Sequence, residues 1–297
     1  MKRSVVCALL ITLSIGFAMG NKGVASGANP TSILDKHSVP STATANAVAT
    51  TAAVSKMRIA TYNIAHARGN KRGGLNELGN ITYLYGIGKL LKNERVDLVG
   101  VTEISKYDLR SGMYNQAWVL AQMLGFKYVI GENAREALFA TSQGNAILSR
   151  YPILWARNHK LYRESAKEEQ RGCLEVQLDI GGGKHLRAFV SHLSLKENES
   201  TRQLQEIWGF IKDLKEPVVL MGDFNSHPVN ERIITMQKNM TDASANVNTT
   251  YMNQPGDKID YLFMYGPIKT AGEAWVRGFE EGYSDHGCLL NDFLILP

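Results

Sequence analysis

A strand–helix–strand pattern that occurs twice is the feature that most constrains how this chain can fold. Apolar, β-branched runs alternate with stretches whose apolar residues recur at helical spacing. The predicted elements are a strand over 58–62, a helix over 85–93 and a strand over 96–101, then a strand over 187–191, a helix over 200–214 and a strand over 218–221. Ligands bind at strand ends in α/β sheets, so the pattern predicts an α/β protein with its site at that edge.

Each of these four strands finishes at a polar side chain, namely Asn63, Glu103, His192 and Asp223. A buried carboxylate without a partner is costly, whereas a strand end that opens onto a cleft presents it to solvent or metal. The run Gly222-Asp223-Phe224-Asn225 is also typical of a turn. Polar strand ends are common in α/β proteins, but four of these residue types favour a functional site.

The predicted helix over 200–214 opens with Ser200 and Gln203 in capping-box register. Trp208 lies on its apolar face, which predicts a place in the core. His159 and His185 adjoin no motif and are predicted to lie at the surface.

The N-terminal part of the chain differs in composition from the rest. Residues 1–20 carry Lys2-Arg3, an apolar run and small residues near position 20, which predicts a secretory signal peptide and a secreted or periplasmic protein. The apolar run is short for a membrane span, so no stable membrane insertion is expected after cleavage. Residues 21–56 predict a flexible linker rich in Ala, Ser and Thr, and residues 57–297 the folded domain, expected to be a monomer.

Charge and cysteine content leave several functions open. The net charge of +5 falls to +3 when residues 1–20 are removed, an excess too small to name a polyanionic partner. Nucleic acid and phospholipid are both compatible with it. Cys173 and Cys288 then remain, and they could pair in an oxidising compartment or stay as buried thiols.

Further polar groups occur in later strand-like segments. Asp260 lies among strand formers over 258–264, and Asp285-His286 precede an apolar run. Oxygen donors without thiolates suit Mg²⁺ or Mn²⁺, and two histidines beside carboxylates suit acid–base chemistry. The candidate set therefore favours metal-assisted hydrolysis of a phosphate ester. Its members are Asn63, Glu103, His192, Asp223, Asn225, Asp260, Asp285 and His286.

Six short motifs occur in order along the folded part. They are Thr61-Tyr62-Asn63-Ile64, Thr102-Glu103-Ile104, Ser191-His192-Leu193, Gly222-Asp223-Phe224-Asn225, Ile259-Asp260-Tyr261 and Ser284-Asp285-His286. With them the chain resembles the endonuclease/exonuclease/phosphatase superfamily, which has the DNase I-like fold. The resemblance implies a four-layer α/β sandwich, in which two mixed β-sheets pack face to face with helices outside. It also places the active site at one end of the sheets.

The resemblance implies roles by motif position. Glu103 would be the principal Mg²⁺ ligand, with Asn63 and Asp285 close to the metal. Asp223 would orient or deprotonate the attacking water, and Asn225 would hold a phosphoryl oxygen.

The resemblance assigns the other polar residues to proton transfer and substrate binding. His192 would stabilise the transition state or help the leaving group, and Asp260 and His286 would form a carboxylate–imidazole dyad. Arg171 resembles a rim arginine that holds substrate phosphate, although a salt bridge at the start of a strand is the alternative. Asn145 is a second candidate substrate contact.

Departures from the family patterns narrow the substrate by exclusion. AP endonucleases usually carry a polar residue at the position of Ala65 and a lysine after the motif glutamate, so a role in base excision is not expected. The residues that follow Asp223 also differ from the motif of inositol-polyphosphate 5-phosphatases. No apolar membrane hairpin like that of neutral sphingomyelinases is evident. The basic, glycine-rich loop over 67–74 could touch a phosphate backbone, or be a solvated surface loop.

These features leave three readings of the function. The chain is predicted to be a phosphodiesterase, with nuclease as the leading class. A phosphomonoesterase or phospholipase C-like enzyme acting on inositol or lipid phosphates is the alternative, and a catalytically silent binding module on the same fold is the third.

Overall fold

The structure, a computed structural model, describes residues 56–70, 78–136, 141–252 and 256–296. They all fall within one unit of the chain, Ala49–Pro297. The predicted signal segment over 1–20 lies outside the described residues, as does the linker over 21–56 except for Lys56. Both stay predictions. Across the described residues, no helix combines the length and apolar character needed to cross a bilayer.

The first sheet is mixed and has seven strands. Their order is β11-β13-β1-β2-β4-β3, and β12 pairs with β13 on the side. The strands are β1 (Met57–Asn63), β2 (Leu98–Ile104), β3 (Lys127–Glu136), β4 (Thr141–Ser149), β11 (Ile268–Thr270), β12 (Trp275–Arg277) and β13 (Cys288–Ile295).

The second sheet is also mixed and has six strands, in the order β5-β6-β7-β8-β10-β9. The hairpin predicted across the glycine run at 181–183 is confirmed, since β6 pairs antiparallel with β7. The strands are β5 (Ile153–Lys160), β6 (Gly172–Asp179), β7 (His185–His192), β8 (Val218–Asp223), β9 (Thr241–Asp242) and β10 (Asp260–Tyr265).

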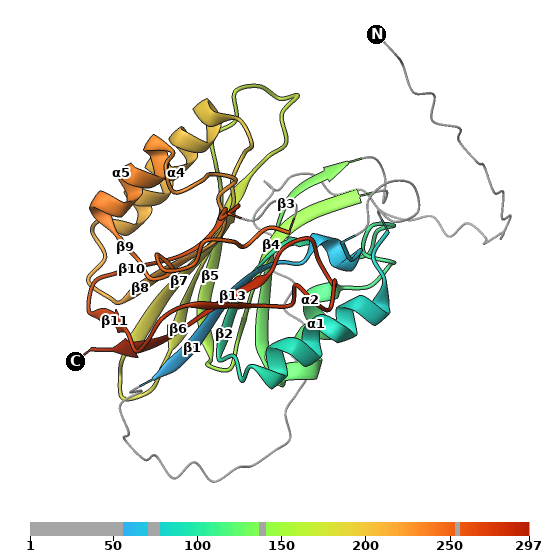
Figure 1. Cartoon of the computed structure of the whole chain (residues 1–297), viewed down its shortest axis with the longest axis horizontal. Coiled ribbons are helices and arrows are strands. Elements are labelled where there is room, and N and C mark those ends of the chain that lie inside the picture. The colour runs from blue at the N-terminus through green and yellow to red at the C-terminus, as the bar shows by residue number, and fades with distance from the viewer. Residues whose placement is uncertain (1–55, 71–77, 137–140, 253–255, 297) are drawn as a thin grey trace, which may run out of the picture. The chain divides into compact units, whose positions relative to one another are not determined.

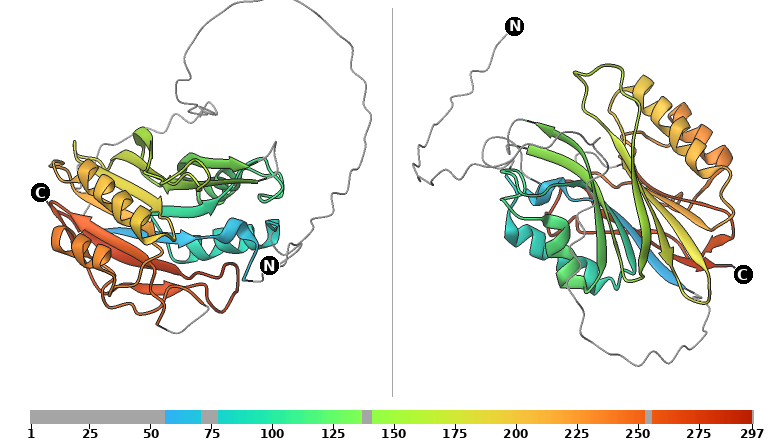
Figure 2. Two further views of the ribbon diagram at one scale, coloured as in Figure 1. Left: turned by 90° about the horizontal axis from the view of Figure 1, so that it is seen from above. Right: turned by 180° about the vertical axis from the view of Figure 1, so that it is seen from behind.

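Helices cover the outer face of each sheet (Figures 1 and 2). Apolar side chains alternate along the strands, so Ile59 packs between the sheets while Ala60 faces the first pair of helices. In the second sheet Val219 faces the inter-sheet core and Leu220 the other helix pair. The predicted four-layer α/β sandwich is confirmed. The helices are α1 (Ile81–Asn93), α2 (Gln116–Leu124), α4 (Glu197–Ile211) and α5 (Glu231–Asn239), with a short helix η1 (Ala65–Ala67).

The start of α4 differs from the prediction. The helix begins at Glu197, so Ser200 lies inside the first turn, where its hydroxyl donates to the carbonyl of Lys196 at 3.0 Å. Gln203 instead accepts from the backbone of Ser194 at 2.9 Å. The capping-box prediction is therefore wrong, because Gln203 ties the helix to the chain that follows β7. Trp208 is half-buried and packs edge-on against Tyr265.

Two parallel strand pairs bring the predicted polar strand ends together. β1 pairs with β2 and β7 with β8, with His192 opposite Asp223. Gly222 permits the second pairing, because a Cβ there would lie 1.9 Å from the carbonyl oxygen of Ser191 and its φ is +138°. Glycine is therefore required immediately before the acid.

Two smaller predictions are resolved by the side-chain packing. Cys173 and Cys288 are both free and buried, which answers the question of pairing in favour of thiols. The prediction that His159 lies at the surface is wrong. Its Nε2 lies 2.7 Å from a carboxylate oxygen of Glu175, and its ring stacks on Phe210 at 4.2 Å.

The buried carboxylate of Glu175 is expected to stabilise the second sheet in a pH-dependent way. Burial raises its pKa, but hydrogen bonds from His159 and Arg187 outweigh that effect and hold the pKa below the ordinary 4.5. A lowered folded-state pKa means that the stabilisation is present above the ordinary pKa and is lost as the pH falls through the folded value. Glu175→Gln should therefore cost about 3 kcal/mol at pH 7 and progressively less below pH 4.5.

Urea unfolding at several pH values measures this difference. Glu231→Gln, the same change at an exposed position, is the matched control and should be nearly neutral. A cost for Glu175→Gln that does not shrink at low pH would contradict the assignment.

Candidate active site

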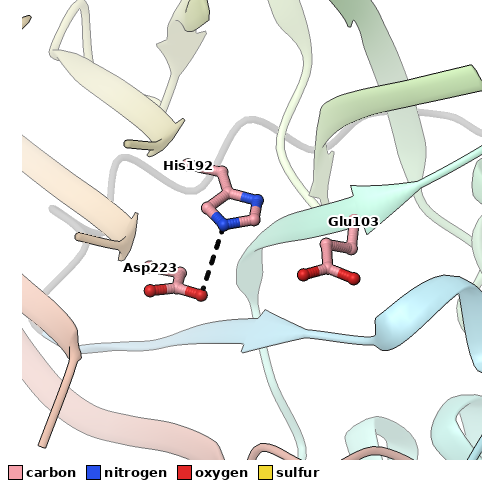
Figure 3. A group of neighbouring side chains, drawn as sticks. All are labelled: Glu103, His192 and Asp223. Carbon is pink, nitrogen blue, oxygen red and sulfur yellow. Dashed lines mark ion pairs between the residues drawn. The ribbon is translucent and has the colours of Figure 1, made fainter. Parts of the chain in front are cut away.

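Three polar side chains from different strands meet at one end of the two sheets (Figure 3). They are Glu103 from β2, His192 from β7 and Asp223 from β8, and each offers an atom within 4.8 Å of the others. Asp223 also belongs to a second cluster of this kind, with Asp260 and His286. Asp223 is thus common to both clusters.

Unusual backbone conformations present several of these side chains. The pairing of β2 with β4 shifts register between Val101 and Ile104, and Glu103 within that bulge has a φ of 49°. Asn225 has a φ of 47°, and His66 in η1 a φ of 54°. Left-handed conformations of residues other than glycine are costly and cluster at functional sites. This strain at the strand ends supports the assignment of the site.

Asn63 connects the two carboxylates. Its side-chain amide donates to Glu103 Oε1 at 3.0 Å and to Asp223 Oδ2 at 2.9 Å. Its own Oδ1 accepts from the backbone of Ala65 at 3.0 Å, which fixes the orientation of the amide. Asn63 therefore presents hydrogen-bond donors to the cluster, and its predicted role beside a metal stays a prediction.

Asp223 is buried and surrounded by hydrogen-bond donors. Its Oδ1 accepts from the backbone of Asn225 at 2.9 Å, and its Oδ2 lies 3.5 Å from His192 Nε2 and 3.7 Å from His286 Nε2. Burial and the neighbouring Asp260 carboxylate raise the pKa of Asp223 to about 7. A carboxylate with such a pKa is suited to accept a proton near neutral pH.

Asp260 and His286 form the predicted carboxylate–imidazole pair. Asp260 Oδ2 lies 2.8 Å from His286 Nδ1, and Asp260 stands opposite Asp223 in the β8–β10 register. Burial lowers the pKa of His286, but the Asp260 carboxylate outweighs it and raises the pKa to about 10. The His286 ring is therefore an imidazolium that lies between two carboxylates.

His192 is in the opposite protonation state. Burial and the positive charge of Arg171 hold its pKa well below the usual range, so its ring is neutral. The side-chain amide of Gln143 lies 3.2 Å from its Nδ1 and donates to it. The proton of the ring is then on Nε2, which faces Asp223. Two histidines of different charge flank one acid, an arrangement that separates acid and base roles.

The last predicted acid of the site, Asp285, contacts a residue that motif reasoning did not single out. Its Oδ2 lies 2.8 Å from a guanidinium nitrogen of Arg68, and both side chains are buried. Asp285 does not join the two clusters, and its metal role stays a prediction. Arg68 belongs to the basic loop over 67–74, of which 71–74 lie outside the described residues. The basic, glycine-rich loop that begins shortly after the first motif was the sequence signal for Arg68.

His66, which follows the first motif closely in sequence, also lies beside Glu103 in the site. Its Nε2 lies 3.5 Å from Glu103 Oε2, and its Nδ1 lies 2.8 Å from the hydroxyl of Ser105. The Ser105 hydroxyl donates to the carbonyl of Ser142 at 2.6 Å, so His66 donates from Nδ1. Burial and the charge of Arg110 lower its pKa well below the usual range, so the ring is neutral.

The two predicted substrate contacts are buried near the site. Arg171 pairs with Glu169 at 3.1 Å, as the salt-bridge alternative predicts, while its second terminal nitrogen is buried without a hydrogen-bond partner. Asn145 donates to the carbonyl of Gly172 at 2.9 Å, which links the two sheets, and its own Oδ1 is unpaired. Their contact with substrate stays a prediction. The side chain of Asn225 donates to the carbonyl of Leu193 at 2.9 Å.

The charges of the site fit a divalent cation. Within the part of the chain that the structure describes, no lysine or arginine pairs with Glu103, Asp223 or Asp260. Asp223 and Asp260 are buried and Glu103 is half-buried, and the single imidazolium of His286 offsets only part of their negative charge. Oxygen donors of this kind suit Mg²⁺ or Mn²⁺. Glu103, which lies within 4.8 Å of His192 and Asp223, is the acid that would hold the ion.

Fold and site together define a class of protein. Residues 60–286 match the sequence model of the Endonuclease/Exonuclease/phosphatase family, so the chain belongs to this family. The uncharacterized protein YbhP of Escherichia coli is 36% identical over 85 residues, which are 28% of this chain and 33% of YbhP. The match thus spans about a third of that curated relative.

Solved structures confirm the DNase I-like fold. A family protein from Beutenbergia cavernae superposes with a TM-score of 0.67 at 19% identity, covering 82% of this chain and 72% of its own. One from Bacteroides vulgatus gives a TM-score of 0.65 at 21% identity, covering 81% and 99%.

Proposed function

We propose that the protein is a divalent-metal-dependent phosphodiesterase that cleaves its substrate by attack of water. The observation that carries this proposal is the position of Asp223. It shares the Asn63 amide with Glu103 and lies between a neutral His192 and a cationic His286. Membership of the family supports phosphoester hydrolysis as the general activity.

The residues of the site divide the work of the reaction. Asp223 accepts the proton of the attacking water, as its raised pKa allows. The His286 imidazolium stabilises negative charge on the phosphoryl oxygens, and His192 Nε2–H donates a hydrogen bond to them. Mg²⁺ or Mn²⁺ held by Glu103 would supply Lewis-acid stabilisation of the same oxygens.

A silent binding module is a poorer account of this site. Glu103, Asp223 and Asp260 gather at one place without a lysine or arginine partner among the described residues. Such an arrangement costs stability, and catalysis explains why it is retained.

Two substrate classes follow from the proposal. Nuclease activity is the leading class from the sequence, and the basic loop over 67–74 is the feature that would contact a nucleic acid backbone. Within that loop, however, Arg68 is buried and pairs with Asp285. The second class comprises lipid phosphates and inositol phosphates. Exposed apolar side chains beside the site favour a lipid phosphate within this class. The predicted secreted or periplasmic location and the monomeric state remain part of the proposal.

A substrate panel tests the proposed activity. Plasmid DNA, RNA, inositol phosphates, sphingomyelin and bis(p-nitrophenyl) phosphate are each offered to the full chain with Mg²⁺, Mn²⁺ or EDTA. We expect metal-dependent cleavage of the model diester and of one natural class. Cleavage of monoesters alone would favour the phosphomonoesterase alternative, and activity that persists in EDTA would refute the metal assignment.

A further inference from the structure

One loop beside the site exposes apolar side chains. It comprises residues 106–115, between β2 and α2, and is called the apolar loop below. Its exposed members are all large and apolar or aromatic, namely Tyr107, Leu109, Met113 and Tyr114. Leu109 and Met113 are 59% and 56% exposed. Large apolar side chains exposed together on one loop point to an interaction site.

The apolar loop holds a defined conformation. The carboxylate of Asp108 is buried and accepts from the backbone of Ser111 at 2.6 Å. Backbone hydrogen bonds join Tyr107 to Tyr114 at 3.0 Å and Met113 to Asp108 at 2.8 Å. The apolar side chains therefore point into solvent from a hydrogen-bonded frame. In sequence Asp108 and the run Arg110-Ser111-Gly112 interrupt them, which is why no apolar hairpin was evident.

The apolar loop adjoins the site directly. Arg110 within it lies 3.5 Å from His66 Nε2, and His66 in turn lies 3.5 Å from Glu103. The carbonyl of Arg110 accepts from the backbone of Gly79 at 2.7 Å, which ties the loop to the start of α1. In Figure 1 the loop, drawn in teal, lies next to η1.

Two further exposed apolar residues come from the opposite sheet. Leu195 follows β7 shortly after His192, and Val229 follows β8 shortly after Asn225. Both loops start at strand ends that contribute to the site. Loops at the site end of both sheets therefore carry exposed apolar side chains.

We infer that the apolar loop, together with Leu195 and Val229, docks the protein on a lipid bilayer. The side chains of Leu109 and Met113 are apolar and not aromatic, which suits insertion among acyl chains. They could not stack on nucleobases, because base stacking requires aromatic rings. Tyrosines such as Tyr107 and Tyr114 prefer the membrane interface. Within the loop Arg110 is half-buried and the acid Asp108 is buried, so the charge nearest the surface is positive and favours anionic lipids. Resting on the proposed function, the substrate class is a phosphodiester presented by a membrane.

Vesicle flotation tests docking without requiring catalysis. The full chain is mixed with vesicles of phosphatidylcholine containing phosphatidylglycerol, and with vesicles of phosphatidylcholine alone. We expect binding that is stronger to the anionic vesicles. The double variant Leu109→Ser, Met113→Ser should bind them roughly tenfold or more weakly, because both side chains lose their transfer into the apolar phase. Its folding is checked by its thermal unfolding midpoint.

Leu154→Ser provides the matched control. Leu154 is 49% exposed on β5 and lies near Leu178, at the end of the sheet away from His192. We expect this variant to bind vesicles like the wild type. Failure of the wild type to float, or equal flotation of the double variant, would overturn the inference.

Two further measurements separate this inference from its alternatives. Binding of a single-stranded oligonucleotide that the double variant loses, with vesicle binding unchanged, would assign the surface to nucleic acid and overturn the inference. Hydrolysis of bis(p-nitrophenyl) phosphate by the wild type is measured separately. Its absence would refute the proposed function and leave the docking result standing.

Discussion

Replacing Asp223 with asparagine is expected to lower kcat for a model phosphodiester by about 10³-fold without unfolding the protein. The change keeps the shape of the side chain, and its remaining oxygen can still accept from the backbone of Asn225. It removes the group that takes the proton from water and one acid that faces Glu103. It also removes the repulsion from Asp260, which offsets the lost hydrogen bonds. Steady-state kinetics and thermal unfolding measure both effects.

Asp213→Asn is the matched control for this prediction. Asp213 is exposed beyond the end of α4 and pairs with its neighbour Lys212 at 3.3 Å. The same chemical change there should leave both kcat and the unfolding midpoint unchanged. Turnover by Asp223→Asn within a few-fold of the wild type would show that another group acts as the base.

Replacing His286 with alanine is expected to lower kcat by about 10²- to 10⁴-fold. The imidazolium lies between Asp260 and Asp223, and its removal leaves the two carboxylates without their shared cation. Asp260→Asn should have a smaller effect on kcat, because the ring stays in place. In that variant the His286 ring should titrate at a lower pH by nuclear magnetic resonance, since Asp260 is the charge that raises its pKa.

His185→Ala is the control for His286→Ala. His185 lies at the start of β7, at the opposite end from His192, and is half-exposed. This variant should keep wild-type turnover. An unchanged His286 titration in Asp260→Asn would contradict the pairing as the cause of the raised pKa.

Local sequence pattern was enough to predict the frame of the site. The strands that end at Asn63, Glu103, His192 and Asp223 follow from apolar runs that stop at polar residues, and their parallel pairing brings those ends together. The glycine before Asp223 fits a steric requirement of the β7–β8 pair. These features depend on neighbours in sequence or in register.

Contacts between distant segments could not be predicted in this way. Arg68 pairs with Asp285 across 217 positions, and His159 is half-buried because Glu175 and Phe210 cover part of its ring. From its sequence the apolar loop would be predicted to be an ordinary polar loop. Only the folded structure shows that its polar residues turn inward. Motif reasoning locates the residues that do chemistry, whereas their charges and surroundings require the structure.

Hydrolysis of bis(p-nitrophenyl) phosphate by the full chain tests the central claim most directly. Release of p-nitrophenolate is followed with Mg²⁺ or Mn²⁺, after addition of EDTA, and after excess metal is restored. We predict turnover that EDTA abolishes and that returned metal restores, and turnover by Asp223→Asn that stays about 10³-fold lower with metal present. Turnover that continues in EDTA, or equal turnover by Asp223→Asn, would contradict a metal-dependent site centred on Asp223.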